Sequence, residues 1–88
     1  MNREEFIQIM HDDNIEHKKI NGCKIFAGLK IITKYLPDEG IGAVGHDIVY
    51  SADIEELINA GITEEDVEEL NKLDWMIEEE YDCLSHFT

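Results

Sequence analysis

Residues 62–75 read Ile-Thr-Glu-Glu-Asp-Val-Glu-Glu-Leu-Asn-Lys-Leu-Asp-Trp, the stretch with the clearest helix signal in the chain. Thr63 can cap a helix whose third position is Asp66, because its hydroxyl can accept a backbone N–H of the first turn. Ile62 and Val67 fit a hydrophobic staple across this cap. The inner edge of the helix is apolar at helical spacing: Val67, Leu70 and Leu73. The stretch therefore predicts a short acidic helix packed on a core.

Two helices are expected upstream of this one. The nearer is capped by Asp53, has Glu56 at its third position and ends at Gly61. Its inward residues are Ile54, Leu57 and Ile58. The farther and longer helix runs from about residue 22 to 35, with Asn21 as its cap, and Pro37 prevents its continuation. Its apolar stripe consists of Ile25, Leu29, Ile32 and Leu36, widened by Phe26 and Tyr35.

A fourth helix and two hairpins complete the predicted elements. The helix runs from about Arg3 to Met10, with Asn2 and Glu5 placed as in a capping box. The first hairpin joins residues 41–44 to 48–50 through Gly45-His46-Asp47, where glycine can supply the positive φ of a tight turn.

The second hairpin is expected at the C-terminus. Residues 75–80 alternate in side-chain direction, Tyr81 and Asp82 form the turn, and residues 83–87 return. Trp75 and Ile77 should then face the core. A helix continuing through residues 75–80 is the alternative, because Glu and Met favour helix.

These elements predict an α+β fold, in which helices pack on one face of a small, mainly antiparallel sheet of about four strands in two hairpins. The 88 residues fit a single domain. Within it, we expect an N-terminal helix and variable lead over residues 1–20 and an α-ββ-αα-ββ core over residues 21–88.

Charge is divided along the chain. Residues 1–36 hold six bases against five acids, a net of +1, whereas residues 37–88 hold one base against sixteen acids, a net of −15. The total of −14 argues against direct binding to nucleic acid or to an anionic membrane, because both are polyanions. Crowded carboxylates are expected to raise one another's pKa, so that stability should increase on mild acidification.

The acid-rich helix has a charge density near that of DNA. Five carboxylates occupy the six positions 64–69, about one charge per 1.5–2 Å of axis, against about 1.7 Å for duplex DNA. One interpretation is a solvated face that keeps a small protein soluble. The sharper hypothesis is a surface that occupies a basic site on another protein, with Trp75, Tyr81 and His86 as candidate anchors. The candidate partner-binding residues are Asp53, Glu55, Glu56, Glu64, Glu65, Asp66, Glu68, Glu69, Trp75, Glu78, Glu80, Tyr81 and Asp82.

No metal, cofactor or catalytic residue is expected. Cys83 and His86 would point to opposite faces of a strand, and the sequence has no Cys-x-x-Cys motif to complete a zinc site. His11 and His17 flank two aspartates in a polar loop. Adjacency of a histidine and an aspartate in the turn at residues 46–47 is not a catalytic triad.

Targeting signals are not expected either. The N-terminus has no basic region followed by an apolar run, and the longest apolar stretch, residues 25–36, is broken by Lys30 and Lys34. Cys23 and Cys83 are expected to be reduced thiols buried as small hydrophobes, so the sequence predicts a cytoplasmic protein.

Three segments carry a resemblance to a known group: Lys34-Tyr35-Leu36-Pro37-Asp38, His46-Asp47-Ile48-Val49-Tyr50, and Leu70-Asn71-Lys72-Leu73-Asp74-Trp75 with Glu79-Glu80-Tyr81-Asp82. They resemble small uncharacterised acidic proteins of phage and prophage genomes over about residues 29–88. Such relatives tend to have glycine before the tryptophan, where this chain has Asp74. The resemblance implies the cytoplasm of a host cell. Small acidic phage proteins often block host enzymes or defence systems, some by imitating nucleic acid. For this chain, that function is an expectation by analogy with the group.

Charge and resemblance together lead to one functional hypothesis. The protein is expected to be a non-enzymatic binding protein of phage type that masks a basic, nucleic-acid-binding surface of a host or defence protein, as a DNA mimic or anti-defence inhibitor. The alternative is a small structural or assembly accessory, with a homodimer as one form, whose acidity serves solubility only. Open hairpin edges that can pair between copies favour the alternative.

Overall fold

A computed structural model of the chain describes residues 1–19, 23–45 and 47–87. The elements follow the order α1 (Arg3–Met10), α2 (Lys24–Tyr35), β1 (Ala43–Val44), β2 (Ile48–Asp53), α3 (Ile54–Asn59), α4 (Glu64–Lys72), β3 (Met76–Glu78) and β4 (Cys83–Phe87). The α+β class predicted from the sequence is confirmed. Within the described residues, no helix combines the length and the apolar character that crossing a bilayer requires.

The sheet has the strand order β1-β2-β4-β3, and each neighbouring pair is antiparallel. Strands β2, β4 and β3 provide most of the pairing, whereas β1 adds only Ala43 and Val44 at one edge. In the central pair, Tyr50 lies opposite Ser85, and the register shifts between Tyr50 and Asp53. The centre of the sheet therefore joins two strands that lie far apart in the sequence.

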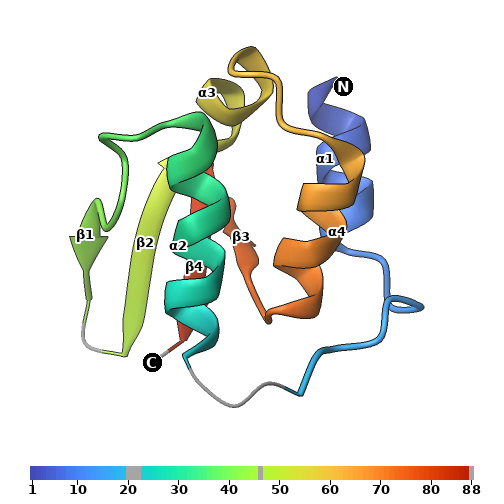
Figure 1. Ribbon diagram of the computed structural model, residues 1–88, viewed down its shortest axis with the longest axis horizontal. Coiled ribbons are helices and arrows are strands. Elements are labelled where there is room, and N and C mark those ends of the chain that lie inside the picture. Colours follow the sequence, from blue (N-terminus) through green and yellow to red (C-terminus); the bar gives the residue numbers. More distant parts are fainter. Residues whose placement is uncertain (20–22, 46, 88) are drawn as a thin grey trace.

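The helices cover one face of this sheet, with α2 lying across β2 and β4 and with α1 beside α4 (Figure 1). Phe6 and Met10 of α1 are buried, and Asn71 of α4 donates to the carbonyl of Ile9 (2.7 Å). The N-terminal helix is therefore an integral part of the core. The buried core cluster consists of Phe6, Met10, Ile32, Ala52, Ile54, Leu57, Ile62, Val67, Leu70, Leu73, Trp75 and Leu84.

The local signals at helix ends were read correctly for three helices. Asn2 and Glu5 form the capping box of α1, and Thr63 accepts the N–H of Asp66 at the start of α4. Asp53 caps α3 by accepting the N–H of Glu55. These interactions span two or three residues, so their sequence signals are complete within a short window.

The start of α2 was predicted wrongly. The helix begins at Lys24 and its N-cap is Cys23, whose sulfur accepts the N–H of Phe26 (3.4 Å). Asn21, the predicted cap, lies outside the described residues. Phe26 was expected to widen the apolar stripe but is 59% exposed, and Nζ of Lys30 lies 4.9 Å from the centroid of its ring.

The C-terminal segment is extended, and the alternative of a continuing helix is wrong. Met76–Glu78 pairs with Cys83–Phe87, and Trp75 is buried just before β3. In the first hairpin, Gly45 donates its N–H to the carbonyl of Ile48 (2.8 Å). His46, which was predicted in that turn, lies outside the described residues.

Candidate functional site

Three parts of the chain meet at Asp82, in the turn between β3 and β4. Arg3, the first residue of α1, forms an ion pair with the Asp82 carboxylate. The N–H of Ile54, the first residue of α3, donates to the Asp82 carbonyl (3.1 Å). Because α1 and α4 run side by side in the same direction, the N-terminus of α4 lies at this end too (Figure 1). Three helix N-termini and the turn therefore share one end of the molecule.

Carboxylates concentrate at this end because each of these helices begins with acidic residues. Negative charge near a helix N-terminus is favoured by the helix dipole, which offsets part of the mutual repulsion. The β3–β4 turn adds two more glutamates. We call the exposed members of this group the acidic end: Glu4, Glu5, Glu55, Glu56, Glu64, Glu65, Glu79 and Glu80.

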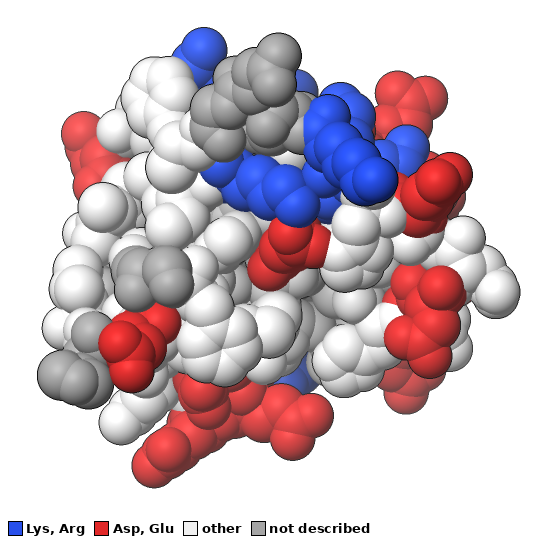
Figure 2. Space-filling view, turned by 90° about the horizontal axis from the view of Figure 1, so that it is seen from below, with Lys and Arg blue, Asp and Glu red and all other residues white. Residues whose placement is uncertain are grey.

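Basic side chains gather on a different face, which is seen from below in Figure 2. Ion pairs join Lys18 to Glu69, Lys24 to Asp74, and Lys34 to Asp66. The bases of the N-terminal half therefore neutralise carboxylates along α4 and at its C-terminus. The acidic end lies away from Lys18 and Lys24, whereas Lys34 pairs with Asp66 in the first turn of α4, beside Glu64 and Glu65. Arg3 is the other base that forms an ion pair at this end among the described residues.

The predicted partner-binding residues fall into three groups by exposure. The exposed ones are Glu55, Glu56, Glu64, Glu65, Glu68, Glu80 and Tyr81. The half-buried ones are Asp53, Asp66, Glu69, Glu78 and Asp82. Trp75 is buried. Sequence reasoning missed Glu4 and Glu5, because nothing local places α1 beside α4 and the turn. It missed Glu79 because the predicted strand alternation put this residue on the side of Trp75 and Ile77, whereas it lies in the turn and is exposed.

Asp66 illustrates how the fold uses part of the predicted surface. Burial pushes its pKa upward, but hydrogen bonds from Lys34 and Tyr35 outweigh that effect and hold the pKa below its usual value. The expected rise from crowding is therefore wrong for Asp66. Since Glu69 is also paired, the unpaired carboxylates of α4 among the described residues are Glu64, Glu65 and Glu68. The effective charge density of α4 is thus lower than the sequence suggested.

Trp75 and His86 cannot serve as surface anchors, because both are buried. Their rings pack edge to face with centroids 5.2 Å apart. The indole N–H of Trp75 donates to the carbonyl of Lys24 (3.3 Å), and Nε2 of His86 lies 2.9 Å from the carbonyl oxygen of Leu73. Tyr81 is 62% exposed and is the one predicted anchor at the surface.

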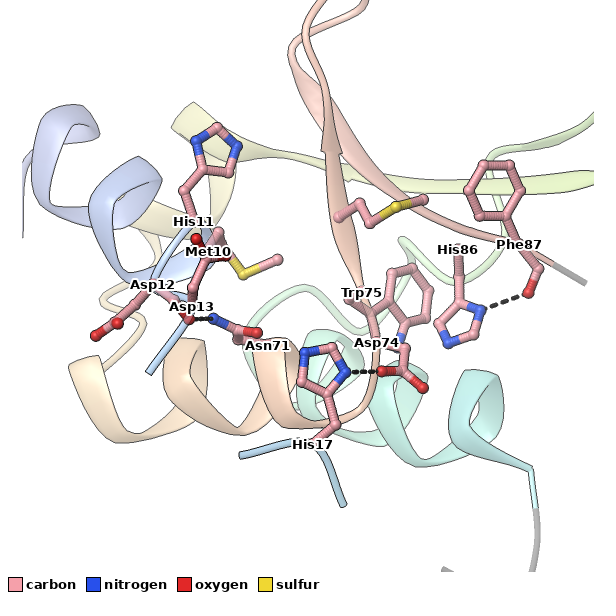
Figure 3. Close-up of a pocket in the computed structure, with 11 residues that line it drawn as sticks. Met10, His11, Asp12, Asp13, His17, Asn71, Asp74, Trp75, His86 and Phe87 are labelled. Carbon is pink, nitrogen blue, oxygen red and sulfur yellow. Dashed lines mark hydrogen bonds and ion pairs between the residues drawn. The ribbon is translucent and has the colours of Figure 1, made fainter. Parts of the chain in front are cut away.

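A cavity of about 620 Å³ lies where the α1–α2 connection meets the α4–β3 junction (Figure 3). Its lining includes His11, Asp12, Asp13, His17, Asn71, Asp74, Trp75 and His86. The Asn71 amide donates to the carbonyls of Ile9 (2.7 Å) and Asp12 (3.2 Å), which fixes the connection against α4. We call this cavity the junction pocket.

Asp74 is the unusual residue of the junction pocket, with a φ of +68°. The N–H of Asp74 donates to the carbonyl of Asn71, and the N–H of Trp75 donates to the carbonyl of Leu70. This is a Schellman motif, and Asp74 holds the position that glycine usually fills. The Asp74 carboxylate pairs with Lys24 and His17, whose hydrogen bonds lower its pKa despite partial burial.

The junction pocket offers little reactive chemistry. The His17 ring binds the Asp74 carboxylate through Nδ1, an arrangement that orients an imidazole (Figure 3). However, none of the described lining residues is a serine, threonine or cysteine. The described residues also contain no group of three side chains suited to hold a metal ion. The pocket is best explained as the place where the connection between α1 and α2 packs against the α4–β3 junction.

Comparison with known proteins found no matching family model, no similar curated protein and no similar solved structure. Functional inference for this chain therefore depends on its own geometry and charge.

Proposed function

We propose that this protein is a non-enzymatic acidic binding protein of phage type that masks a basic, nucleic-acid-binding surface of a host or defence protein in the host cytoplasm. The observation that carries the proposal is the acidic end. Its eight glutamates come from three helix starts and one turn, are all exposed, and have no ion-pair partner among the described residues.

The physical reason is electrostatic complementarity. Proteins that bind nucleic acid present arrays of lysine and arginine to the phosphate backbone. A compact cluster of carboxylates offers such a surface an alternative polyanion, and the attraction accelerates association at low salt. The net charge of −14 at the same time disfavours binding of this protein to the nucleic acid itself.

The fold keeps this charge available. Lys18 and Lys24 form ion pairs with Glu69 and Asp74, away from the acidic end, and Lys34 is paired with Asp66 rather than with the neighbouring Glu64 or Glu65. Helix dipoles favour the carboxylates in the first turns of α1 and α4 without removing their charge. The fold therefore fixes the backbone positions of the acidic end before any partner arrives, which lowers the entropy cost of binding.

Capture from a bacterial lysate tests the proposal. The wild-type protein should retain a nucleic-acid-binding protein at low salt, and high salt or added duplex DNA should release it. The double variant Glu64→Gln/Glu65→Gln should capture much less. The matched control Glu16→Gln/Asp47→Asn removes the same charge from exposed positions outside the acidic end and should capture normally.

Two results would reject the proposal. One is capture that ignores both salt and DNA. The other is an equal loss of capture in the two double variants, since that would mean that only total charge matters.

The alternative is a structural or assembly accessory that works as a homodimer. It is favoured by the β1 edge, where Ile41 is 54% and Val44 is 65% exposed. An unpaired strand edge with apolar side chains can pair with a second copy. Light scattering tests this: a monomer across the accessible concentration range would reject the alternative, whereas a concentration-dependent dimer lost in Val44→Lys would favour it.

A further inference from the structure

A second cavity, of about 430 Å³, opens beside the acidic end. Its lining comes from five separate parts of the chain: the loop after α2, strand β2, helix α3, the β3–β4 turn and strand β4. The lining residues that matter here are Glu39, Tyr50, Asp53, Glu56, Tyr81 and Cys83. We call it the tyrosine pocket. Glu56 belongs to both the acidic end and this pocket, so the two surfaces are continuous.

Two aromatic rings form one side of the tyrosine pocket. Tyr50 and Tyr81 meet edge to face, with ring centroids 5.8 Å apart and planes at 85°. Tyr81 stays 62% exposed in spite of its size, so its ring is available to a ligand. The face of an aromatic ring carries partial negative charge and attracts cations.

Carboxylates from three different elements line the same pocket, namely Glu39, Asp53 and Glu56. None of them forms an ion pair with a described base. One oxygen of Asp53 accepts the N–H of Glu55 (2.9 Å) as the cap of α3, and its second oxygen remains for a ligand. An anionic ligand would be repelled from this lining, whereas a cation would be attracted.

Two titratable groups of the lining, the half-buried Tyr50 and the buried Cys83, have raised pKa values, with burial as the larger cause and nearby carboxylates as the second. Burial, followed by the charge of Glu78, raises the pKa of Tyr50. Burial, followed by the charges of Glu78, Asp53 and Asp82, raises the pKa of Cys83. Cys83 is only 8% exposed, so it forms a buried part of the lining.

We infer that the tyrosine pocket receives an arginine side chain from the basic partner, with its guanidinium against the Tyr81 ring and its N–H groups donated to Glu39, Asp53 and Glu56. Arginine fits better than lysine because its planar guanidinium stacks on an aromatic ring and presents five donors to carboxylates in different directions. This inference rests on the proposed function and adds a specific contact to it. Arginine is also the basic residue enriched at interface hot spots.

Peptide titration tests the inference. A short capped peptide with one central arginine should shift the NMR signals of Tyr50, Tyr81 and Cys83. Replacement of that arginine by lysine should weaken binding about fivefold, and replacement by uncharged citrulline should abolish it. Tyr81→Ala should weaken binding about five- to tenfold, whereas Tyr81→Phe should keep it, because the ring remains.

A matched pair of charge variants distinguishes binding in the tyrosine pocket from general attraction to the acidic end. Glu56→Gln lies in the pocket and Glu65→Gln lies at the acidic end outside it, and both residues are exposed helix positions. Only Glu56→Gln should weaken the binding of the arginine peptide. Equal weakening by both variants would overturn the pocket inference and leave the proposed function standing.

Two further outcomes are decisive. Arginine amide bound as tightly as the peptide would overturn the assignment to a partner protein's side chain. Tight peptide binding, combined with lysate capture that ignores Glu64→Gln/Glu65→Gln, would support the pocket and reject the proposed function.

Discussion

The indole of Trp75 lies directly on the backbone of Gly28. A Cβ atom at Gly28 would sit 1.9 Å from Nε1 of Trp75, far inside van der Waals contact. The same indole N–H donates to the carbonyl of Lys24, one turn earlier in α2. Trp75 therefore attaches α2 to the α4–β3 junction, and position 28 has no room for a side chain.

Gly28→Ala should consequently destabilise the protein by about 2 kcal/mol. Overpacking a buried site costs about 1–3 kcal/mol, and the better helix propensity of alanine returns at most about 1 kcal/mol. Urea unfolding measures the change. Gly40→Ala is the control, because nothing lies within 4 Å of a Cβ there, and it should stay within about 0.5 kcal/mol of wild type. An unchanged midpoint for Gly28→Ala would contradict the packing described.

Substitution of Asp74 should change the stability of the protein by an amount that depends on the backbone conformation at this position and on its ion pairs. Asp74→Gly relieves the φ of +68° but removes the contacts to Lys24 and His17. These effects oppose each other, so stability should change by less than about 1 kcal/mol. Asp74→Ala loses the ion pairs and keeps a disfavoured φ, and should cost about 1–2 kcal/mol. Equal urea unfolding midpoints for Asp74→Ala and Asp74→Gly would contradict this account.

Acid should destabilise the protein through Asp66 and Asp74. Both have a pKa below the usual value, so their contribution is present above the unfolded pKa of about 3.9 and is lost as pH falls through the folded pKa. This sign is opposite to the one expected from crowding alone. The melting temperature should therefore fall between pH 5 and pH 3, which circular dichroism can follow.

The matched variants for this test are two double substitutions. Asp66→Asn/Asp74→Asn should flatten the acid limb of the melting curve. Asp38→Asn/Asp47→Asn changes exposed carboxylates without an ion pair among the described residues and should keep it. A melting temperature that rises on acidification in wild type would restore the crowding interpretation.

The two cysteines should differ in reactivity. Both are free, but Cys23 is exposed and Cys83 is buried, and burial raises the pKa of the Cys83 thiol. The thiolate is the reactive form, so alkylation at neutral pH should modify Cys23 first and Cys83 at least about tenfold more slowly. Mass spectrometry counts the labels, and urea should expose the second thiol. Equal labelling rates in the folded protein would contradict the buried position of Cys83.

Features that depend on residues close together in the sequence were predicted better than features that depend on distant residues. The caps at Asn2, Asp53 and Thr63 involve groups two or three residues away, and all three were predicted. The start of α2 was missed because Cys23 is not a typical cap and Asn21 is. Asp74 stood out in the sequence because similar proteins tend to have glycine there, but its ion pairs with His17 and Lys24, distant in the chain, were not predicted.

The acidic character of the candidate site was predicted from the sequence, but the set of residues that form it was predicted only in part. A strongly acidic second half follows from counting residues, and Glu55, Glu56, Glu64, Glu65 and Glu80 are exposed as expected. Trp75 was predicted both to face the core and to anchor a partner, and the structure confirms the first prediction and contradicts the second, because Trp75 is buried. Only the structure places it under α2.

By itself, the sequence determined the starts of α1, α3 and α4, the α+β class and the excess of negative charge, because each depends on neighbours along the chain or on composition. The tertiary structure decided which charges remain available. Lys24 and Asp74 are 50 positions apart and Lys18 and Glu69 are 51 apart, yet each pair is in contact. It also decided that Tyr50 and Tyr81 share a pocket with three carboxylates. Non-local strand pairing and helix packing bring such residues together, and no local pattern encodes those distances.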